Sequence, residues 1–584
     1  MRYGRSAIAA GATAVALALA GCGGTAVTNG GSNNQAAHRG GTLRILGQSD
    51  IFNLDPVSAY YTVSSMIELL FTRQLYQYRD VANFAQQIKP VPDIATGYPV
   101  ITDGGKTYTI HIKSGVMWDT TPPRQVSAAD FVRGFKFLCN PQSPTGAPGY
   151  FTGTIVGMAS YCAGFAKVKA NVAAIDAYVN SHTVPGVVAA GPLTLVFHLM
   201  NPATDFLNIL AMGFCSARPV EYMRYLPDSP AFRQHTLSDG PYKITSYTPD
   251  RSFVFVRNPA WKQSTDSLRH AYVNEFTVTE GLNATSVQQQ LEAGTGDMEW
   301  DVGPPPEDLP GLESSHNSGL VISSYPTGFT YVTLNQYAGP FRNVKLRQAV
   351  AYALDKNAIV RILGGPSIAQ AATQFMLPGS TGYVSGFNPY PDNNGNGNPS
   401  MARKLIKEAG FPHGVTIKLI YSTTDPTPRE AQAMQSSLQA AGFTVKLIPV
   451  TQSDWYGKYL EIPSTAKGDV WDISLPGWIP DWFGNNGRAT IVPIFTKPGL
   501  LTNDFDGYNS PVTNGLVNSA LSAPSQSAAA SFWAKANEQV VKDVADVPLI
   551  YQRWTVFHSS RVHGCTFFVY ALSCDPANVW LSGS

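Results

Sequence analysis

The clearest pattern of apolar and polar positions lies in residues 331–365. Residues 331–335 form a short β-prone run that the turn at Gly339 and Pro340 ends, so a strand is predicted there. Behind this turn, Asn343 stands where a helix N-cap is expected. The apolar positions that follow recur on one helical face, and they are Leu346, Ala349, Val350, Ala353 and Leu354.

A second short helix is predicted directly after the first. Asp355 can cap its start, and Gly364 with Gly365 would end it. Four polar or basic positions lie off the apolar stripe and are expected to face away from the core: Lys345, Arg347, Gln348 and Lys356. Taken alone, this stretch is a strand, a turn and two capped helices, and it contains no residues that indicate catalysis or binding.

Two further stretches indicate an α/β fold. Residues 98–113 alternate apolar and polar positions on either side of a turn at residues 103–105, as in a β-hairpin. Later in the chain, helical and strand patterns alternate with short links, which is typical of an α/β lobe. These patterns cover the helix 399–410, the strand 415–421, the helix 428–441 and the strand 443–449.

The first 40 residues have the pattern of a targeting segment. A basic start leads into the apolar run 7–20, which is too short to span a bilayer, and this run ends at Cys22 in a sequence that resembles a bacterial lipobox. We expect a signal peptide over 1–21, a lipidated Cys22, and a flexible Gly/Asn/Ser/Thr-rich tether over 22–39. The mature protein would then be extracytoplasmic, anchored to the outer face of the cell membrane. The alternative is a signal peptide cut elsewhere, with an incidental cysteine.

Composition narrows the classes of partner. The 584 residues carry a formal net charge of +1, and loss of residues 1–21 would change it to −1, because that segment holds two arginines and no acid. A nearly neutral chain argues against a nucleic-acid partner. The length exceeds a single core, so two or three domains are expected. Aromatic residues make up 11% of the chain, which suits a core and also a lined cavity.

Five cysteines remain after Cys22, an odd number for an oxidising compartment. Two pairs lie close together in the sequence, and we predict the disulfides Cys139–Cys162 and Cys565–Cys574. Cys215 lies in an apolar run and is predicted to be a buried free thiol.

The usual catalytic constellations are missing from the sequence. Ser464 and Lys467 fit an S-x-x-K pattern, but the S-D-N and K-T-G elements that accompany it in penicillin-binding enzymes are absent. His558 and His563 would face unlike sides of a predicted strand. We therefore expect no enzyme activity, no cofactor and no metal site.

The sequence of residues 331–365 resembles the signature of the family 5 extracellular solute-binding proteins, the peptide-binding components of ABC importers. Weaker resemblances occur at Asp239–Tyr242, at the start of the mature chain, and at Val547–Tyr551. The residues that match the main signature are Asn335, Pro340, Phe341, Asn343, Leu346, Arg347, Ala349, Val350, Ala353, Leu354, Asp355, Lys356 and Ile359.

This resemblance implies a two-lobed α/β fold of the periplasmic-binding-protein type, with mixed sheets flanked by helices and a ligand cleft between the lobes. Lobe I would be discontinuous, with an inserted subdomain. The expected parts are lobe I over 40–60, 191–327 and 547–584, the inserted subdomain over 61–190, and lobe II over 328–546.

The resemblance also points to a ligand site after the predicted strand 467–474. An aspartate of the family binds the α-amino group of the ligand, and Asp481 stands at its position. The plain alternative is that Asp481 caps a turn and that the tryptophans beside it belong to the core. The candidate ligand-binding residues are Asp481, Trp478, Trp482, Gly477, Tyr60 and Tyr61.

The expected function is capture of an oligopeptide by closure of the lobes, followed by delivery to the membrane subunits of an ABC permease. The protein is expected to act as a monomer. Two alternatives stay open: a non-peptide ligand, such as a sugar, an opine-like compound or a metal chelate, and a peptide-sensing lipoprotein that does not transport. A hydrolase is disfavoured by the missing catalytic residues.

Overall fold

The protein is described here by a computed structural model, which describes residues 37–60, 62–496 and 505–583. A seven-stranded sheet holds the strand predicted at residues 331–335, and this strand is β15 (Gly328–Leu334). The other strands are β16 (Ala369–Ala371), β17 (Val415–Ser422), β18 (Phe443–Val450), β19 (Ile473–Ser474), β20 (Gly477–Trp478) and β21 (Val547–Gln552). β15 pairs antiparallel with β19, β20 and β21.

The two capped helices predicted after β15 are confirmed. Helix α11 (Val344–Ala353) begins after Asn343, whose side chain accepts a backbone hydrogen bond of 3.0 Å. Helix α12 (Lys356–Ile362) begins after Asp355, whose carboxylate accepts one of 2.9 Å. Each bond satisfies a backbone donor that the start of a helix leaves without a partner. All five apolar residues of the predicted stripe are buried.

Two basic residues expected to face away from this core are buried instead, so that prediction is wrong for them. Lys356 pairs with Asp392 at 3.0 Å. Helical periodicity predicts the face of the helix from which a side chain leaves the backbone. A long side chain can still place its charged end away from that face. Arg347 donates hydrogen bonds of 2.8–3.1 Å to the backbone carbonyls of Phe341, Asp543 and Val544.

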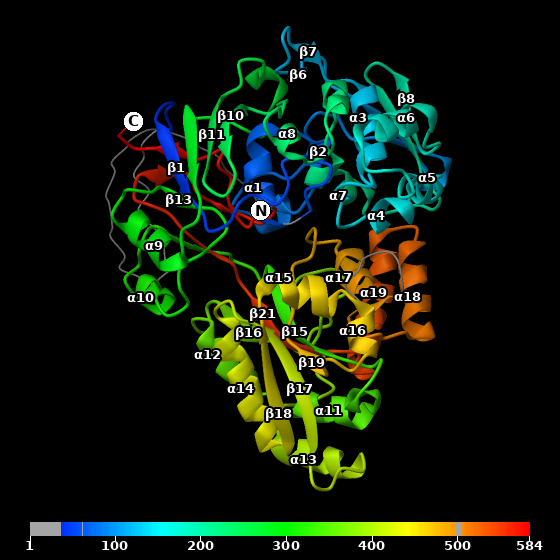
Figure 1. Cartoon of the computed structure of the whole chain (residues 1–584), viewed down its shortest axis with the longest axis vertical. Helices are drawn as coiled ribbons and strands as arrows, with labels where there is room; N and C mark the ends of the chain where they lie inside the picture. The colour runs from blue at the N-terminus through cyan, green and yellow to red at the C-terminus, as the bar shows by residue number, and fades with distance from the viewer. Residues whose placement is uncertain (1–36, 61, 497–504, 584) are drawn as a thin grey trace, which may run out of the picture. The chain divides into compact units, whose positions relative to one another are not determined.

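The alternation of helices and strands predicted over residues 399–449 is confirmed. Helix α13 (Pro399–Glu408) starts with its proline in the first turn, where the missing N–H costs nothing. Helix α14 (Thr427–Ala440) connects β17 to β18, which run parallel and in register. Figure 1 shows the two strands side by side, with α14 along them. This is the crossover connection that parallel strands require.

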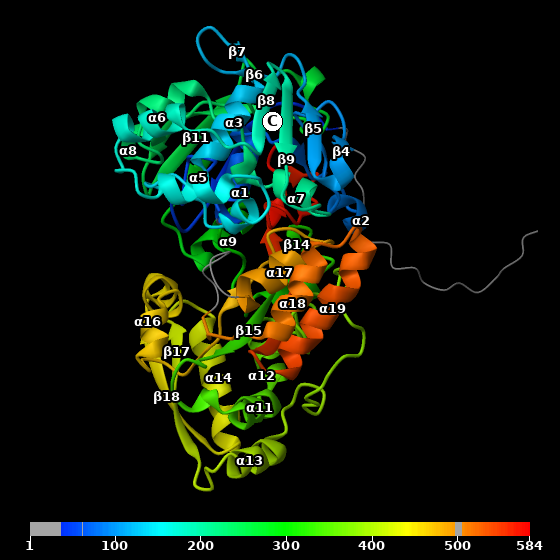
Figure 2. The ribbon, with the colours of Figure 1, turned by 90° about the vertical axis from the view of Figure 1, so that its right-hand side faces the viewer.

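Three helices form a second layer beside this sheet. Their apolar side chains pack with Phe329 and Tyr331 of β15 and with Phe375 in one buried cluster. The helices are α17 (Gly487–Phe495), α18 (Pro511–Leu521) and α19 (Gln526–Lys542). Helices α18 and α19 lie side by side in both views (Figures 1 and 2).

A five-stranded sheet forms the centre of the part assigned to lobe I. β1 pairs parallel with β12 and β13, and β11 pairs antiparallel with β10 and β12. Alternate residues of β1, among them Leu43 and Ile45, are fully buried in the largest apolar cluster. The strands are β1 (Thr42–Leu46), β10 (Tyr242–Thr248), β11 (Ser252–Arg257), β12 (Glu275–Thr279) and β13 (Met298–Glu299).

A four-stranded sheet contains the predicted hairpin and spans the expected end of the inserted subdomain. β4 (Val100–Thr102) and β5 (Thr107–His111) pair around the turn at residues 103–105, as expected. The expected boundary at residue 190 lies inside β8 (Val187–Gly191), which pairs with β9 (Thr194–His198), and β9 pairs with β5. The sheet therefore includes strands on both sides of that boundary.

The position at which lobe I resumes also differs from the expectation. The sequence places residues 547–584 in lobe I, whereas β21 pairs with β15 and β16 in the seven-stranded sheet. The next strand, β22 (Thr555–Phe557), pairs with β14 (Leu320–Ile322) outside that sheet. The apolar composition of a buried strand does not reveal which sheet it joins, so this assignment needed the tertiary structure.

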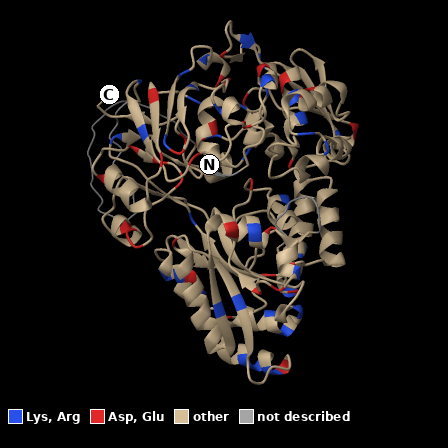
Figure 3. Cartoon of the chain, in the orientation of Figure 1, with Lys and Arg blue, Asp and Glu red and all other residues tan. Residues whose placement is uncertain are grey.

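No helix within the described residues is long and apolar enough to cross a membrane. Lysine and arginine are interspersed with aspartate and glutamate over the helices and strands drawn in Figure 3. This distribution agrees with the nearly neutral net charge of the sequence.

Candidate functional site

Asp481 lies in the loop between strand β20 and helix α17. Strand β20 is held against β15, where Trp478 is opposite Phe329. Pro480 precedes Asp481 and restricts the backbone at this point, because its ring fixes φ. The Asp481 carboxylate thus lies on a short loop that joins a strand of the seven-stranded sheet to a helix of the second layer.

The Asp481 carboxylate contacts two tyrosine hydroxyls from distant parts of the sequence. Tyr150, on the short helix α4 (Gly149–Thr152), donates a hydrogen bond to Oδ2, and the Tyr60 hydroxyl lies 3.4 Å from the same oxygen. Tyr150 is buried, whereas Tyr60 and Asp481 are partly exposed. The structure therefore brings Tyr60 and Asp481 together and adds Tyr150. No local pattern indicated Tyr150, because its helix is only one turn long.

The electrostatics of this group are set by burial. Burial raises the pKa of Asp481 to about 6, and the two tyrosine hydroxyls lower it in part. Burial and the nearby carboxylate raise the pKa of Tyr150 well above its ordinary value, so the phenol remains a donor. Within the described residues, Asp481 has hydroxyl donors but no ion pair with lysine, arginine or histidine. The site can therefore receive a cation.

The two candidate tryptophans have different positions. Trp482 is fully buried, and its indole N–H donates to the Asn485 carbonyl at 2.7 Å. Its ring centroid lies 5.0 Å from that of Tyr150, so it supports the tyrosine that contacts Asp481. Trp478 is half-buried, and its N–H donates to the Ala489 carbonyl at 2.9 Å. Both indoles are thus oriented by the backbone of their own segment.

A small cavity opens beside the carboxylate. Its volume is about 30 Å³. The residues that line it include Tyr60, Asp481 and Trp482, together with Tyr78, Met212 and Tyr570. Trp478 and Gly477 do not line it. Gly477 is exposed, and its N–H faces the Tyr456 hydroxyl at 3.4 Å.

A second, larger cavity has Tyr150 in its wall. Its volume is about 400 Å³, and its wall includes Tyr150, Thr154 and Arg488. Arg488 is buried and lies 3.0 Å from Asp205. Neither Arg488 nor Asp205 was indicated by the sequence, because each carries no motif and they are distant along the chain.

Two predicted residues cannot be placed. Tyr61 and the lipidation candidate Cys22 lie outside the residues that the structure describes. In the described part of the chain, no group of three or more histidine, cysteine, aspartate or glutamate side chains could hold a metal ion.

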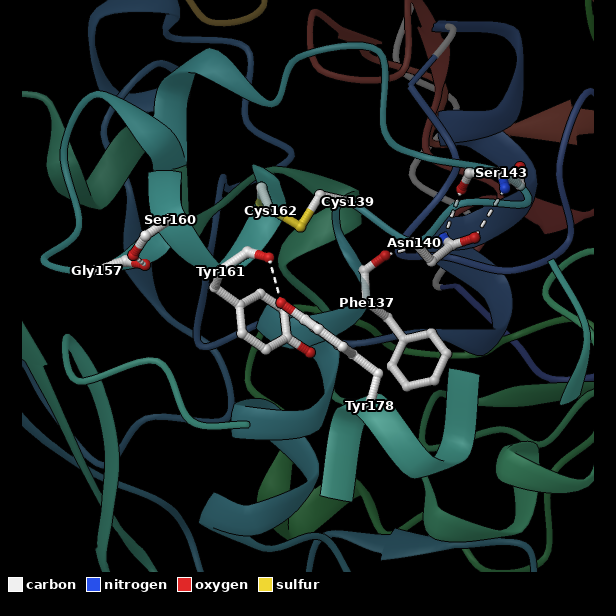
Figure 4. Close-up of a disulfide and its surroundings, with 9 residues drawn as sticks. All are labelled: Phe137, Cys139, Asn140, Ser143, Gly157, Ser160, Tyr161, Cys162 and Tyr178. Carbon is white, nitrogen blue, oxygen red and sulfur yellow. Dashed lines mark hydrogen bonds between the residues drawn. A yellow bond between two sulfur atoms is a disulfide. The ribbon is translucent and has the colours of Figure 1, made fainter. Parts of the chain in front are cut away.

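The cysteines are joined in the two pairs that the sequence predicts. Cys139 and Cys162 have Cα atoms 5.4 Å apart, and those of Cys565 and Cys574 are 5.0 Å apart. Figure 4 shows the first bridge beside Tyr178, whose hydroxyl donates to the Tyr161 carbonyl at 2.8 Å. Cys215 is buried without a disulfide, and burial raises the pKa of its thiol well above the ordinary value. Such a thiol is a poor nucleophile.

Curated relatives match most of this chain at low identity. The heme-binding protein A of Haemophilus influenzae is 24% identical over 484 residues, which cover 80% of this chain and 79% of the relative. The di/tripeptide-binding protein 1 of Pseudomonas aeruginosa is 25% identical over 496 residues, with coverage of 81% and 82%. The glutathione-binding protein GsiB of Salmonella typhi is 24% identical over 532 residues, with coverage of 88% and 90%.

Solved structures share the fold. The clavulanic acid biosynthesis oligopeptide binding protein 2 superposes with a TM-score of 0.81 at 21% identity, covering 94% of this chain and 96% of that one. The periplasmic binding protein DppA from Helicobacter pylori gives 0.73 at 20% identity, with coverage of 93% and 98%. The family model described as "Bacterial extracellular solute-binding proteins, family 5 Middle" matches residues 89–490, more than half of the sequence. With its two-lobed α/β fold, the chain belongs to family 5 of the bacterial extracellular solute-binding proteins.

Proposed function

We propose that this protein is the substrate-binding lipoprotein of an ABC importer and that it captures oligopeptides by their free amino terminus. The observation that carries this proposal is the Asp481 carboxylate, which receives hydroxyl donors from Tyr60 and Tyr150 but has no cationic partner within the described residues. The named ligands of two relatives, di- and tripeptides and glutathione, support the same ligand class.

The geometry around Asp481 suits an ammonium group. Both tyrosine hydroxyls are directed at Oδ2, so Oδ1 keeps its capacity to accept a hydrogen bond. An ammonium has three N–H donors and no acceptor. Its burial without a counter-charge would cost several kcal/mol, whereas a carboxylate beside it removes most of that cost. A peptide amino terminus held here would therefore complete the charge balance of the site.

Capture by closure follows from the origin of the site residues. Tyr60 and Tyr150 precede residue 327, in the parts assigned to lobe I and its insert, and Asp481 belongs to the part assigned to lobe II. A ligand that contacts both lobes binds the closed form better and shifts the population toward it. We place the lobe boundaries near residue 328 and after residue 552, where the chain leaves the seven-stranded sheet.

A non-peptide solute is the second candidate, because a relative of equal similarity is named for heme. Mass spectrometry of ligand that copurifies with the protein separates the two candidates. An oligopeptide mass supports our proposal, and a porphyrin, sugar or chelate mass contradicts it. Delivery to a permease, as opposed to sensing, is tested by peptide uptake in cells that lack this protein.

Substitution of Asp481 tests amine recognition directly. Asp481→Asn should weaken binding of a free-amine peptide by about 2–4 kcal/mol, the usual loss when one partner of a buried charged pair is neutralised. The N-acetylated peptide should bind the wild type weakly and should be nearly indifferent to the substitution. Titration calorimetry of both peptides against both proteins gives the comparison.

The matched control is Asp308→Asn, which neutralises an exposed carboxylate before helix α10 (Leu309–Ser314). This variant should bind both peptides as the wild type does. Equal losses of the two peptides in Asp481→Asn, or no loss of either, would remove Asp481 from amine recognition.

A further inference from the structure

Among the residues that the structure describes, the larger cavity is lined by one charged side chain. It is bounded by the short helix α4 and residues 153–154, by residues 201–203, and by helices α17 and α18. Among the described residues, its lining contains Arg488 and no aspartate or glutamate. The remaining polar groups of the wall are uncharged, and they come from Tyr150, Thr154, Asn201, Asn518 and Ser522.

The Arg488 guanidinium is held in a defined orientation. Its Nη1 donates to the Thr154 hydroxyl at 2.8 Å, and its Nε lies 3.0 Å from Asp205 Oδ2. All three side chains are more than nine-tenths buried. Within the described residues, Nη2 makes no hydrogen bond, and Arg488 lines the cavity.

Tyr150 connects this cavity to the proposed amine site. Its hydroxyl donates to Asp481, while the same residue lines the larger cavity. The charge of Arg488 also acts on Tyr150, where it lowers the phenol pKa against the opposing effects of burial and Asp481. Tyr150 is therefore under the influence of both a carboxylate and a guanidinium.

We propose that this cavity is a specificity pocket of the ligand site, in which Arg488 selects a ligand group with oxygen acceptors, a carboxylate or a carboxamide, and rejects a cationic group. The inference rests on the proposed function, since it assumes a ligand whose ammonium is held at Asp481. A carboxylate or amide oxygen can accept from Nη2, and charged hydrogen bonds of this kind are stronger than neutral ones. A lysine or arginine side chain would meet a like charge in a confined space, which is unfavourable.

A set of free-amine tetrapeptides tests this pocket. Each of the first three positions carries glutamate, glutamine or lysine in turn, with alanine elsewhere, and affinities are measured by titration calorimetry. At one position, the glutamate and glutamine peptides should bind at least about tenfold more tightly than the lysine peptide. The other positions should discriminate less.

Two variants assign the effect to Arg488. Arg488→Gln removes the charge but leaves Asp205 buried without its partner, so its folding could suffer. Arg488→Gln combined with Asp205→Asn removes both charges and is the decisive variant. In it, the preference against lysine should fall to within about twofold. The control Arg361→Gln changes an arginine with a 67% exposed side chain and should keep the wild-type preference.

Each outcome decides the proposal. Equal affinities at all three positions, or a preference that survives in the double variant, would overturn the pocket while leaving amine recognition intact, provided that Asp481→Asn still weakens all peptides alike. If no free-amine peptide binds the wild type, the proposed function fails and the pocket fails with it. If the preference against lysine is lost in the double variant and kept in Arg361→Gln, the result supports the assignment of the pocket to Arg488.

Discussion

At the scale of single residues, the site is defined by a carboxylate whose charge is only partly compensated. Burial raises the pKa of Asp481 to about 6 from an ordinary value of 3.8. The ligand-free fold therefore binds this proton more tightly than the unfolded chain does. Its contribution to stability is present at low pH and is lost as pH rises through about 4 to 6. At neutral pH the ligand-free fold therefore lacks this contribution to its stability.

Peptide affinity should depend on pH with the opposite sign. The charged carboxylate is the form that pairs with an ammonium, and the peptide amine itself loses its proton at about pH 8, so affinity for a free-amine peptide should be highest at about pH 7. Below the pKa of about 6 it should fall, by up to tenfold per pH unit. Calorimetric titration between pH 5 and pH 8 measures this. Asp481→Asn should flatten the profile, and a profile unchanged in that variant would assign the titration to another group.

At the scale of elements, buried polar side chains tie together segments that are distant in the sequence. Arg347 on α11 reaches the backbone just after α19, where helix-end carbonyls would otherwise lack donors. Asp481 on the β20–α17 loop reaches α4 in the same manner. The elements themselves follow local patterns, but these connections depend on side chains whose ends lie far from their own backbone.

Arg347→Met should lower the free energy of unfolding by about 2–4 kcal/mol, because three backbone carbonyls, in two buried hydrogen bonds and one partly buried, lose a charged donor. Lys345→Met is the matched control on the same helix. Lys345 is 44% exposed in its side chain and pairs with Glu408 on the surface, so its loss should cost less than about 1 kcal/mol. Urea titration of both variants gives the comparison. Equal losses would contradict a capping role for Arg347.

At the scale of the whole molecule, the proposed mechanism is closure of two lobes on a ligand. The contacts of Asp481 and Arg488 with Tyr150, Thr154 and Asp205 join segments from before residue 327 to segments from after it. A ligand that fills the cavities beside these contacts would stabilise the closed form by its differential affinity. Lipid at Cys22 would keep the binding protein close to the membrane.

Small-angle scattering should record this closure. The radius of gyration should decrease when wild-type protein is saturated with a free-amine peptide, because a ligand that contacted both lobes would close them. Asp481→Asn at the same peptide concentration should show a smaller decrease, in proportion to its lower occupancy. A radius that stays constant at saturation in the wild type would count against closure.

Membrane attachment is tested at Cys22. Cys22→Ser should either release the protein from the membrane fraction or leave it unprocessed, since a serine cannot carry the lipid through a thioether. Cell fractionation with detection of the protein's size distinguishes these forms. Fractionation of the variant with membrane at the mature size would refute the anchor.

The sequence could predict the elements that depend on local order. The strand at 331–335, the helices capped by Asn343 and Asp355, the hairpin at 98–113 and the α/β alternation follow from periodicity and from residues that act on their immediate neighbours. The family followed from one long motif in the same region. The ligand role of Asp481 stays a prediction, although the structure places Tyr60 beside it.

What the tertiary structure decided is which distant side chains meet. Tyr150 and Arg488 stand in segments without a motif, and only the folded chain places both in the wall of one cavity. The burial of Arg347 and the membership of β21 in the seven-stranded sheet were likewise invisible to periodicity. The physical reason is the same in each case. A local pattern specifies the face on which a side chain starts, whereas its partners are set by packing between elements, which carries no signature at the position itself.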